Sequence, residues 1–93
     1  MKNLEKIREE INQIDDQIVR LFVERLSLMQ EVATAKKTAG GKVYDPKREE
    51  EILARLKALA PKQYEKQVET LYERIFSCCK EVQSVFFDGE DGK

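Results

Sequence analysis

Apolar side chains in the first third of the chain recur at alternating steps of three and four residues, the spacing that places them along one face of a helix. This series, called the seam below, comprises Leu4, Ile7, Ile11, Ile14, Ile18, Leu21, Arg25, Leu28, Val32 and Ala35. Neither glycine nor proline interrupts it, so we predict one helix from about Leu4 to about Lys37, roughly 50 Å long. A compact chain of this length has a radius of gyration of about 12 to 13 Å, so a monomer would leave much of the seam uncovered. We therefore expect a second chain to cover it.

Two further helices are predicted after a glycine-containing connection at residues 38–44. Asp45 followed by Pro46 is typical of a helix N-terminus, because the carboxylate accepts backbone N–H groups and proline fits the first turn. Pro61 is expected to end this second helix and to open a third. The apolar positions are Ile52, Leu53, Leu56 and Leu59 in the second helix and Tyr64, Val68, Leu71, Ile75, Cys78, Val82 and Val85 in the third, with Tyr72, Cys79 and Phe86 in a flanking row.

The sequence thus predicts an all-α fold with one long, one short and one medium helix. These form a single helical domain at residues 1–87, because 93 residues are too few for two domains. The polar segment 88–93 has no apolar periodicity and is expected to be a disordered tail.

Composition narrows the classes of function. With 17 basic and 18 acidic side chains the net charge is −1, which indicates neither nucleic acid nor an anionic membrane as a partner. The apolar runs are too short for a signal peptide or a membrane span, so we expect a cytoplasmic protein. Adjacent Cys78 and Cys79 point about 100° apart on a helix, which argues against a mutual disulfide and for buried thiols in a reducing compartment. Because the chain has no histidine and no CxxC motif, we expect no zinc site and no histidine acid or base.

One cation lies within the seam itself. Arg25 occupies a position where a helix that needs only a partner would carry leucine, and a guanidinium buried without an anion is strongly unfavourable. Lys36 follows eleven residues later, so the two side chains face the same way with Cα atoms roughly 16 Å apart. Arg8 lies roughly 25 Å from Arg25 along the helix, too far to share a pocket within one chain. In an antiparallel pair of these helices, however, Arg8 of one chain would approach Arg25 of the other.

These cations predict an anionic ligand. Arg48, one turn before Ile52 in the second helix, adds a guanidinium that leans toward the core. A pocket ringed by these positive charges needs a ligand that is at least a dianion, and the planar guanidinium fork suits a carboxylate. The cations are Arg8, Arg25, Lys36 and Arg48, and recognition of hydroxyl and ether groups would come from Asp45, Glu49 and Gln83.

Each candidate also has a purely structural interpretation. Arg25 alone is typical of a side chain that extends along the helix to reach solvent, or of one that fixes helix register. The other cations could lie on solvated helix faces, since 38% of the residues are charged. Taken singly, Asp45 is an N-cap, Glu49 a first-turn partner of the helix dipole, Gln83 a surface residue and Cys79 an apolar filler.

Taken together, the residues resemble the all-helical chorismate mutase family. The resemblance covers nearly the whole chain: L-x-x-I-R-x-x-I-x-x-I-D at 4–15, L-F-x-x-R at 21–25, A-K at 35–36, V-Y-D-P-x-R-E at 43–49, and L-Y-x-x-I-F at 71–76 followed by Gln83. It implies an interlocked antiparallel homodimer of three-helix chains with two equivalent sites. It also implies an isomerase that converts chorismate to prephenate in phenylalanine and tyrosine biosynthesis.

The resemblance further implies roles for individual residues. Family active-site positions on one chain match Arg25, Lys36, Asp45, Arg48, Glu49, Cys79 and Gln83, and Arg8 matches the arginine donated by the other chain. Lys36, Gln83 and Arg25 are the expected catalytic residues. Cys79 replaces a serine that touches the substrate in some members, and a thiol is expected to weaken that contact. Gln83 matches a glutamine or a glutamate and can donate a hydrogen bond at any pH.

The implied reaction is a concerted rearrangement within one molecule, so no cofactor, metal or nucleophile is expected. The site has to hold a dicarboxylate in a folded, chair-like conformer and stabilise negative charge on the breaking ether oxygen. Two other interpretations stay open on the sequence alone. One is pyruvate elimination from isochorismate on the same scaffold, and the other is a non-catalytic regulatory or dimerisation module.

Overall fold

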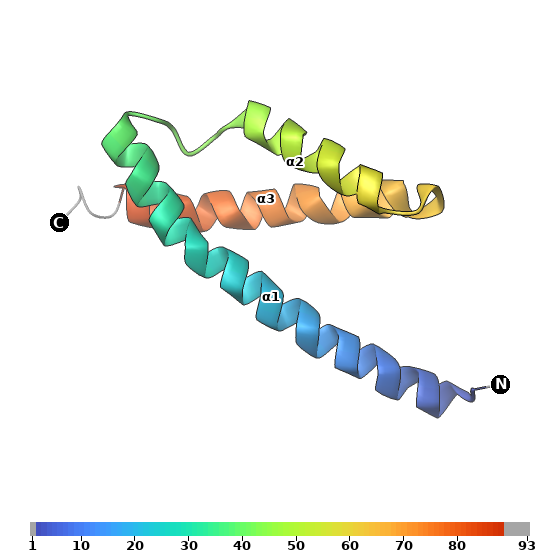
Figure 1. Cartoon of the computed structure of the whole chain (residues 1–93). Helices are drawn as coiled ribbons and strands as arrows, with labels where there is room; N and C mark the ends of the chain where they lie inside the picture. Colours follow the sequence, from blue (N-terminus) through green and yellow to red (C-terminus); the bar gives the residue numbers. More distant parts are fainter. Residues whose placement is uncertain (1, 89–93) are drawn as a thin grey trace.

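The computed structural model describes residues 2–88, which form three α-helices and one short 3₁₀ helix (Figure 1). Their bounds are α1 (Leu4–Ala39), α2 (Pro46–Leu59), η1 (Lys62–Tyr64) and α3 (Glu65–Asp88). Residues 2–88 contain no strand, which confirms the predicted all-helical class. Of the tail predicted at 88–93, Asp88 ends α3, and positions 89–93 lie outside the described residues.

The ends of α1 and α2 follow from local sequence chemistry. The Asn3 side chain accepts the N–H of Lys6 at 2.8 Å and so caps α1. Gly40 ends α1 with a φ of 80°, in the left-handed region that glycine enters without steric cost. The Asp45 carboxylate accepts the N–H of Arg48 at 3.2 Å ahead of Pro46, which confirms the predicted start of α2.

The third helix begins later than the sequence predicts. Pro61 does not open it: Pro61 precedes η1, and α3 starts at Glu65. The N–H of Tyr64 donates to the carbonyl of Pro61 at 2.9 Å, so the chain makes a tighter turn before the regular helix is established.

Helix α3 packs against both α1 and α2, while the N-terminal half of α1 extends away from the other helices (Figure 1). The buried side chains are Met29, Ala33, Ile52, Phe76, Cys79 and Gln83. The radius of gyration is 16.8 Å and the longest dimension is 57 Å, whereas a compact chain of this size has a radius of about 12 to 13 Å. The described residues therefore form an elongated unit with a small core at one end of α1.

Most of the seam is not covered within this chain. Seven large seam residues have exposed fractions between 41% and 63%: Leu4, Ile7, Ile11, Ile14, Ile18, Leu21 and Leu28. On α3 the row predicted to be apolar is likewise exposed at Leu71 and Val85, at 54% and 66%. Cys79, from the row predicted only to flank it, turns inward together with Phe76. The part of the intrachain core that comes from α3 is thus Phe76, Cys79 and Gln83, none of which belongs to the row predicted to be apolar.

Two further predictions concern the cysteines and the membrane. Cys78 and Cys79 are both free thiols, as predicted; Cys79 is buried as expected, whereas Cys78 is only half-buried. None of the helices within residues 2–88 is long and apolar enough to cross a membrane.

Candidate active site

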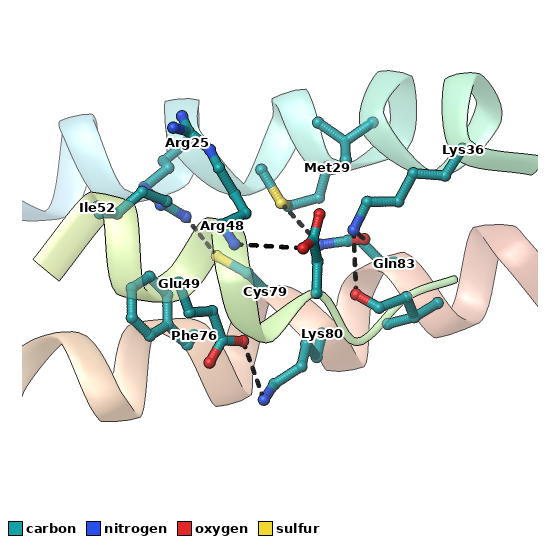
Figure 2. Close-up of a pocket in the computed structure, with 13 residues that line it drawn as sticks. Arg25, Met29, Lys36, Arg48, Glu49, Ile52, Phe76, Cys79, Lys80 and Gln83 are labelled. Atoms are coloured by element: carbon teal, nitrogen blue, oxygen red, sulfur yellow. Dashed lines mark hydrogen bonds and ion pairs between the residues drawn. The ribbon is translucent and has the colours of Figure 1, made fainter. Parts of the chain in front are cut away.

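The C-terminal half of α1, the start of α2 and the middle of α3 surround a cavity of about 340 Å³ (Figure 2). Seven of the eight residues selected from the sequence line it: Arg25, Lys36, Asp45, Arg48, Glu49, Cys79 and Gln83. Apolar walls come from Met29, Val32, Ile52 and Phe76. Folding therefore brings together residues from positions 25 to 83, which are far apart in the sequence.

Lys36 and Gln83 contact each other directly in the wall of the cavity (Figure 2). The Lys36 ammonium donates to Gln83 Oε1 at 3.1 Å and to the Val43 carbonyl at 3.0 Å. Gln83 is only 6% exposed, and its Nε2 donates to Met29 Sδ at 3.4 Å, so the interpretation of Gln83 as a surface residue is wrong. The Gln83 amide oxygen accepts the hydrogen bond from Lys36, so the N–H groups of the same amide lie beside the ammonium and provide a second donor.

The Arg25 guanidinium is held between α1 and α3 (Figure 2). Its Nη1 donates to Cys79 Sγ at 2.8 Å, and its Cζ lies 5.8 Å from the centroid of the Tyr72 ring. Tyr72 packs edge-on against Phe76 with ring centroids 5.8 Å apart. Burial raises the pKa of the Cys79 thiol, and the nearby Arg25 charge opposes this shift. The thiol is therefore protonated at neutral pH and accepts the guanidinium N–H as a neutral group.

The Arg48 side chain does not lean toward the core, although the sequence predicted that it would. Its side chain is 62% exposed, and Nη1 lies 3.7 Å from Glu51 Oε1, so the guanidinium points toward solvent at the rim of the cavity and not toward the core. An exposed pair of residues three apart on one helix contributes less than about 1 kcal/mol. The Arg48 guanidinium can therefore exchange Glu51 for an anion in the cavity at little cost.

Lys80 also lines the cavity, although it is not among the residues predicted from the sequence. Its Nζ lies 3.1 Å from Glu49 Oε2 and 4.6 Å from the centroid of the Tyr44 ring. Lys80 directly follows Cys79, so it lies about 100° further around α3, outside the row that faces inward. The only signal in the sequence is a cation adjacent to an inward-facing residue, and such a signal is common on any charged helix.

Arg8 is the one selected residue that does not line this cavity. It is exposed near the N-terminus of α1, beside a shallow surface hollow that it shares with Leu4, Glu5, Glu9 and Asn12. This placement agrees with the separation expected between Arg8 and Arg25 along one straight helix.

The charge around the cavity is unbalanced. Four cations line it, namely Arg25, Lys36, Arg48 and Lys80, against the two carboxylates of Asp45 and Glu49. Asp45 is engaged at the start of α2 and Glu49 with Lys80, whereas Arg25 and Lys36 donate to neutral groups. Within residues 2–88, no group of three or more His, Cys, Asp or Glu is arranged to hold a metal ion. The arrangement suits an organic anion with more than one negative group.

Comparison with known proteins identifies relatives. The family model described as chorismate mutase type II matches residues 7–84. The chain is 31% identical over 84 residues to a protein of Aquifex aeolicus named "Bifunctional chorismate mutase/prephenate dehydratase", covering 85% of this chain and 23% of that protein. It is 39% identical over 59 residues to a protein of Methanocaldococcus jannaschii named "Chorismate mutase", covering 63% of this chain and 60% of that one. The chain thus aligns with less than two thirds of either relative. No solved structure gave a significant match.

Proposed function

Because this chain belongs to the chorismate mutase type II family, we propose that it is an isomerase that converts chorismate to prephenate in the synthesis of phenylalanine and tyrosine. The observation that carries the proposal is the pair of cations, Arg25 and Lys36, that face one cavity and that donate, within residues 2–88, to neutral partners there. A dicarboxylate would supply the missing negative charge. The reaction would take place in the cytoplasm.

The proposed mechanism relies on positioning and on charge stabilisation. Chorismate rearranges within one molecule as its ether C–O bond breaks and a new C–C bond forms, so the enzyme has to hold the folded conformer. Lys36 and Gln83 would donate to the ether oxygen, because both present N–H groups from adjacent positions in the cavity. A preorganised donor aimed at developing charge is worth about 3 to 4 kcal/mol in the transition state.

The remaining residues would bind the substrate ground state and transition state alike. Arg25 and Arg48 would clamp carboxylates, with Arg48 turning inward from the rim. Glu49 and the backbone of Asp45 would bind the ring hydroxyl. Cys79 would contribute through Arg25, because its sulfur already accepts a hydrogen bond from that guanidinium.

We further propose that two chains form an interlocked antiparallel homodimer in which Arg8 of one chain completes the site of the other. The exposed seam supports this, since seven large apolar side chains on one helix would otherwise face water. Exposed Arg8 at the far end of the same helix supports it too, because antiparallel packing carries Arg8 toward the partner's cavity. Two equivalent sites per dimer would result from the symmetry.

Following the loss of chorismate by its ultraviolet absorbance, with identification of prephenate as product, tests the activity. A folded protein that leaves chorismate unchanged would refute the proposal. Supplying isochorismate in parallel separates mutase activity from pyruvate elimination, since the second reaction releases pyruvate.

Mixing two inactive variants tests the shared site. Arg8→Ala and Arg25→Ala homodimers should each be inactive, because every site lacks one arginine. After subunit exchange, each mixed dimer has one site with both arginines and one with neither, so an equal mixture should recover about one quarter of wild-type activity. Exchange shown by mass spectrometry without any recovery would contradict the donation of Arg8 across the interface.

A further inference from the structure

Lys80 connects three segments around the cavity. It lies on α3, its ammonium is 3.1 Å from the Glu49 carboxylate on α2, and the same ammonium is 4.6 Å from the centroid of the Tyr44 ring in the connection between α1 and α2. The side chains of Lys80 and Glu49 are 32% and 24% exposed, so the pair is more shielded from water than the exposed ion pairs near the start of α1. Shielding strengthens such a contact and orients it.

The connection itself is held by two lysines. Val43 accepts a hydrogen bond from Lys36, and the next residue, Tyr44, lies over the ammonium of Lys80. Lys80 therefore contacts both the Glu49 carboxylate and the Tyr44 ring, and Figure 2 shows the Glu49 carboxylate turned toward the Lys80 ammonium. One cation thus contacts both the carboxylate on α2 and a side chain of the connection that precedes α2.

The charge of Glu49 poses a problem for the proposed substrate. An unpartnered carboxylate in this cavity would repel a dicarboxylate, yet a carboxylate is a strong acceptor for a hydroxyl group. The ion pair with Lys80 offsets the charge and leaves lone pairs of Glu49 available, since a carboxylate can accept about four hydrogen bonds.

We propose that Lys80 is a positioning residue that holds Glu49 as the acceptor for the ring hydroxyl and thereby determines selectivity for substrates that carry this group. The inference rests on the proposed function. Lys80 itself does not contact the reacting atoms in this role, because its ammonium is directed at the Glu49 carboxylate (Figure 2).

The test compares two substrates with the protein in its native assembly: chorismate, and an analogue in which hydrogen replaces the ring hydroxyl. Lys80→Met keeps the length of the side chain but removes its charge. We expect kcat/KM for chorismate to fall about tenfold, the loss typical of one misplaced hydrogen bond to a charged group, and kcat/KM for the analogue to change less than about twofold. Lys80→Arg should retain most of the selectivity, because it retains the charge beside Glu49.

A second ion pair between α2 and α3 provides the matched control. Lys57 and Glu69 lie 3.6 Å apart with similar exposure, 38% and 33%, and neither lines the cavity. Lys57→Met should therefore leave the ratio of the two kcat/KM values unchanged. In a Glu49→Gln background, Lys80→Met should no longer alter that ratio, because the carboxylate on which Lys80 acts is absent.

The outcomes distinguish the two proposals. Equal losses on both substrates in a folded Lys80→Met variant, or no loss on either, would overturn the role of Lys80 while leaving the mutase function intact. No turnover of chorismate by the wild-type protein would refute the proposed function and the role of Lys80 with it.

Discussion

Replacing Lys36 with methionine tests the centre of the site most directly. Methionine retains an unbranched apolar side chain but removes the ammonium that donates to Gln83 Oε1 at 3.1 Å and to the Val43 carbonyl at 3.0 Å. Gln83 is 6% exposed, so its oxygen would lose its partner in a place that water barely reaches. Leaving a buried acceptor without a partner costs about 1 to 3 kcal/mol.

The expected effects on stability and on catalysis differ in size. The thermal midpoint should fall by about 4 to 8 °C for each kcal/mol lost in a chain of this size. The loss of a donor to the ether oxygen should lower kcat by about 10² to 10³, since that interaction strengthens as the bond breaks. Both measurements should be made at one protein concentration, because the stability of the proposed dimer would depend on it.

A double variant separates these two effects. Lys36→Met/Gln83→Leu removes the stranded amide together with the ammonium, so the thermal midpoint should recover while activity stays low. Lys42→Met, at an exposed position of the adjoining connection, controls for the loss of a positive charge. A folded Lys36→Met variant that loses less than tenfold in kcat would refute the assignment of Lys36 to the ether oxygen.

Two further substitutions test the balance of charge and the state of the thiol. Arg25→Leu removes one of four cations around the cavity, so it should stabilise the unliganded protein by about 1 kcal/mol and raise its thermal midpoint by a few degrees. The same substitution should lower kcat/KM at least about a hundredfold. A variant that is less stable, or one that is fully active, would contradict this prediction. Because burial raises the pKa of Cys79 above its ordinary value of 9.0, the folded protein keeps the proton that the unfolded chain loses, so stability should fall as the pH rises above about 9. Cys79→Ser should show a shallower fall in thermal midpoint between pH 8 and about 10.5, and identical pH dependence in both proteins would refute the assigned shift.

The sequence alone was sufficient to predict the three α-helices and most of the residues that line the cavity. Gly40, Asp45 and Pro46 mark the break between α1 and α2, because their effects act within one turn of the backbone. The cavity residues of α1 could be predicted because a cation within an apolar series is unfavourable unless an anion or water accompanies it. The sequence predicts the start of α3 at Pro61, four residues before its actual start at Glu65, because a proline permits a 3₁₀ turn as readily as the first turn of an α-helix.

The sequence could not decide which way α3 faces. It carries two apolar rows, and periodicity alone does not distinguish the row that packs within the chain from a row that awaits another chain. When α3 packs against α1 and α2, the side chains of Phe76, Cys79 and Gln83 become buried. Gln83, taken singly, is interpreted from the sequence as a surface residue. The contact of Lys80 with Glu49 depends on the same packing, because it joins two helices whose residues are far apart in the sequence. Rules that relate residues within one or two helical turns cannot predict such a contact.

By itself, then, the sequence determined three helices, their breaks, and a set of cations that no apolar core would hold without an anion. Only the tertiary structure decided which of those cations share a cavity, that Arg48 stands at its rim, and that Lys80 belongs to it. The physical reason is that capping and periodicity act over one or two turns, whereas a site is built where helices cross. Those crossings depend on the fit of side chains from distant parts of the chain.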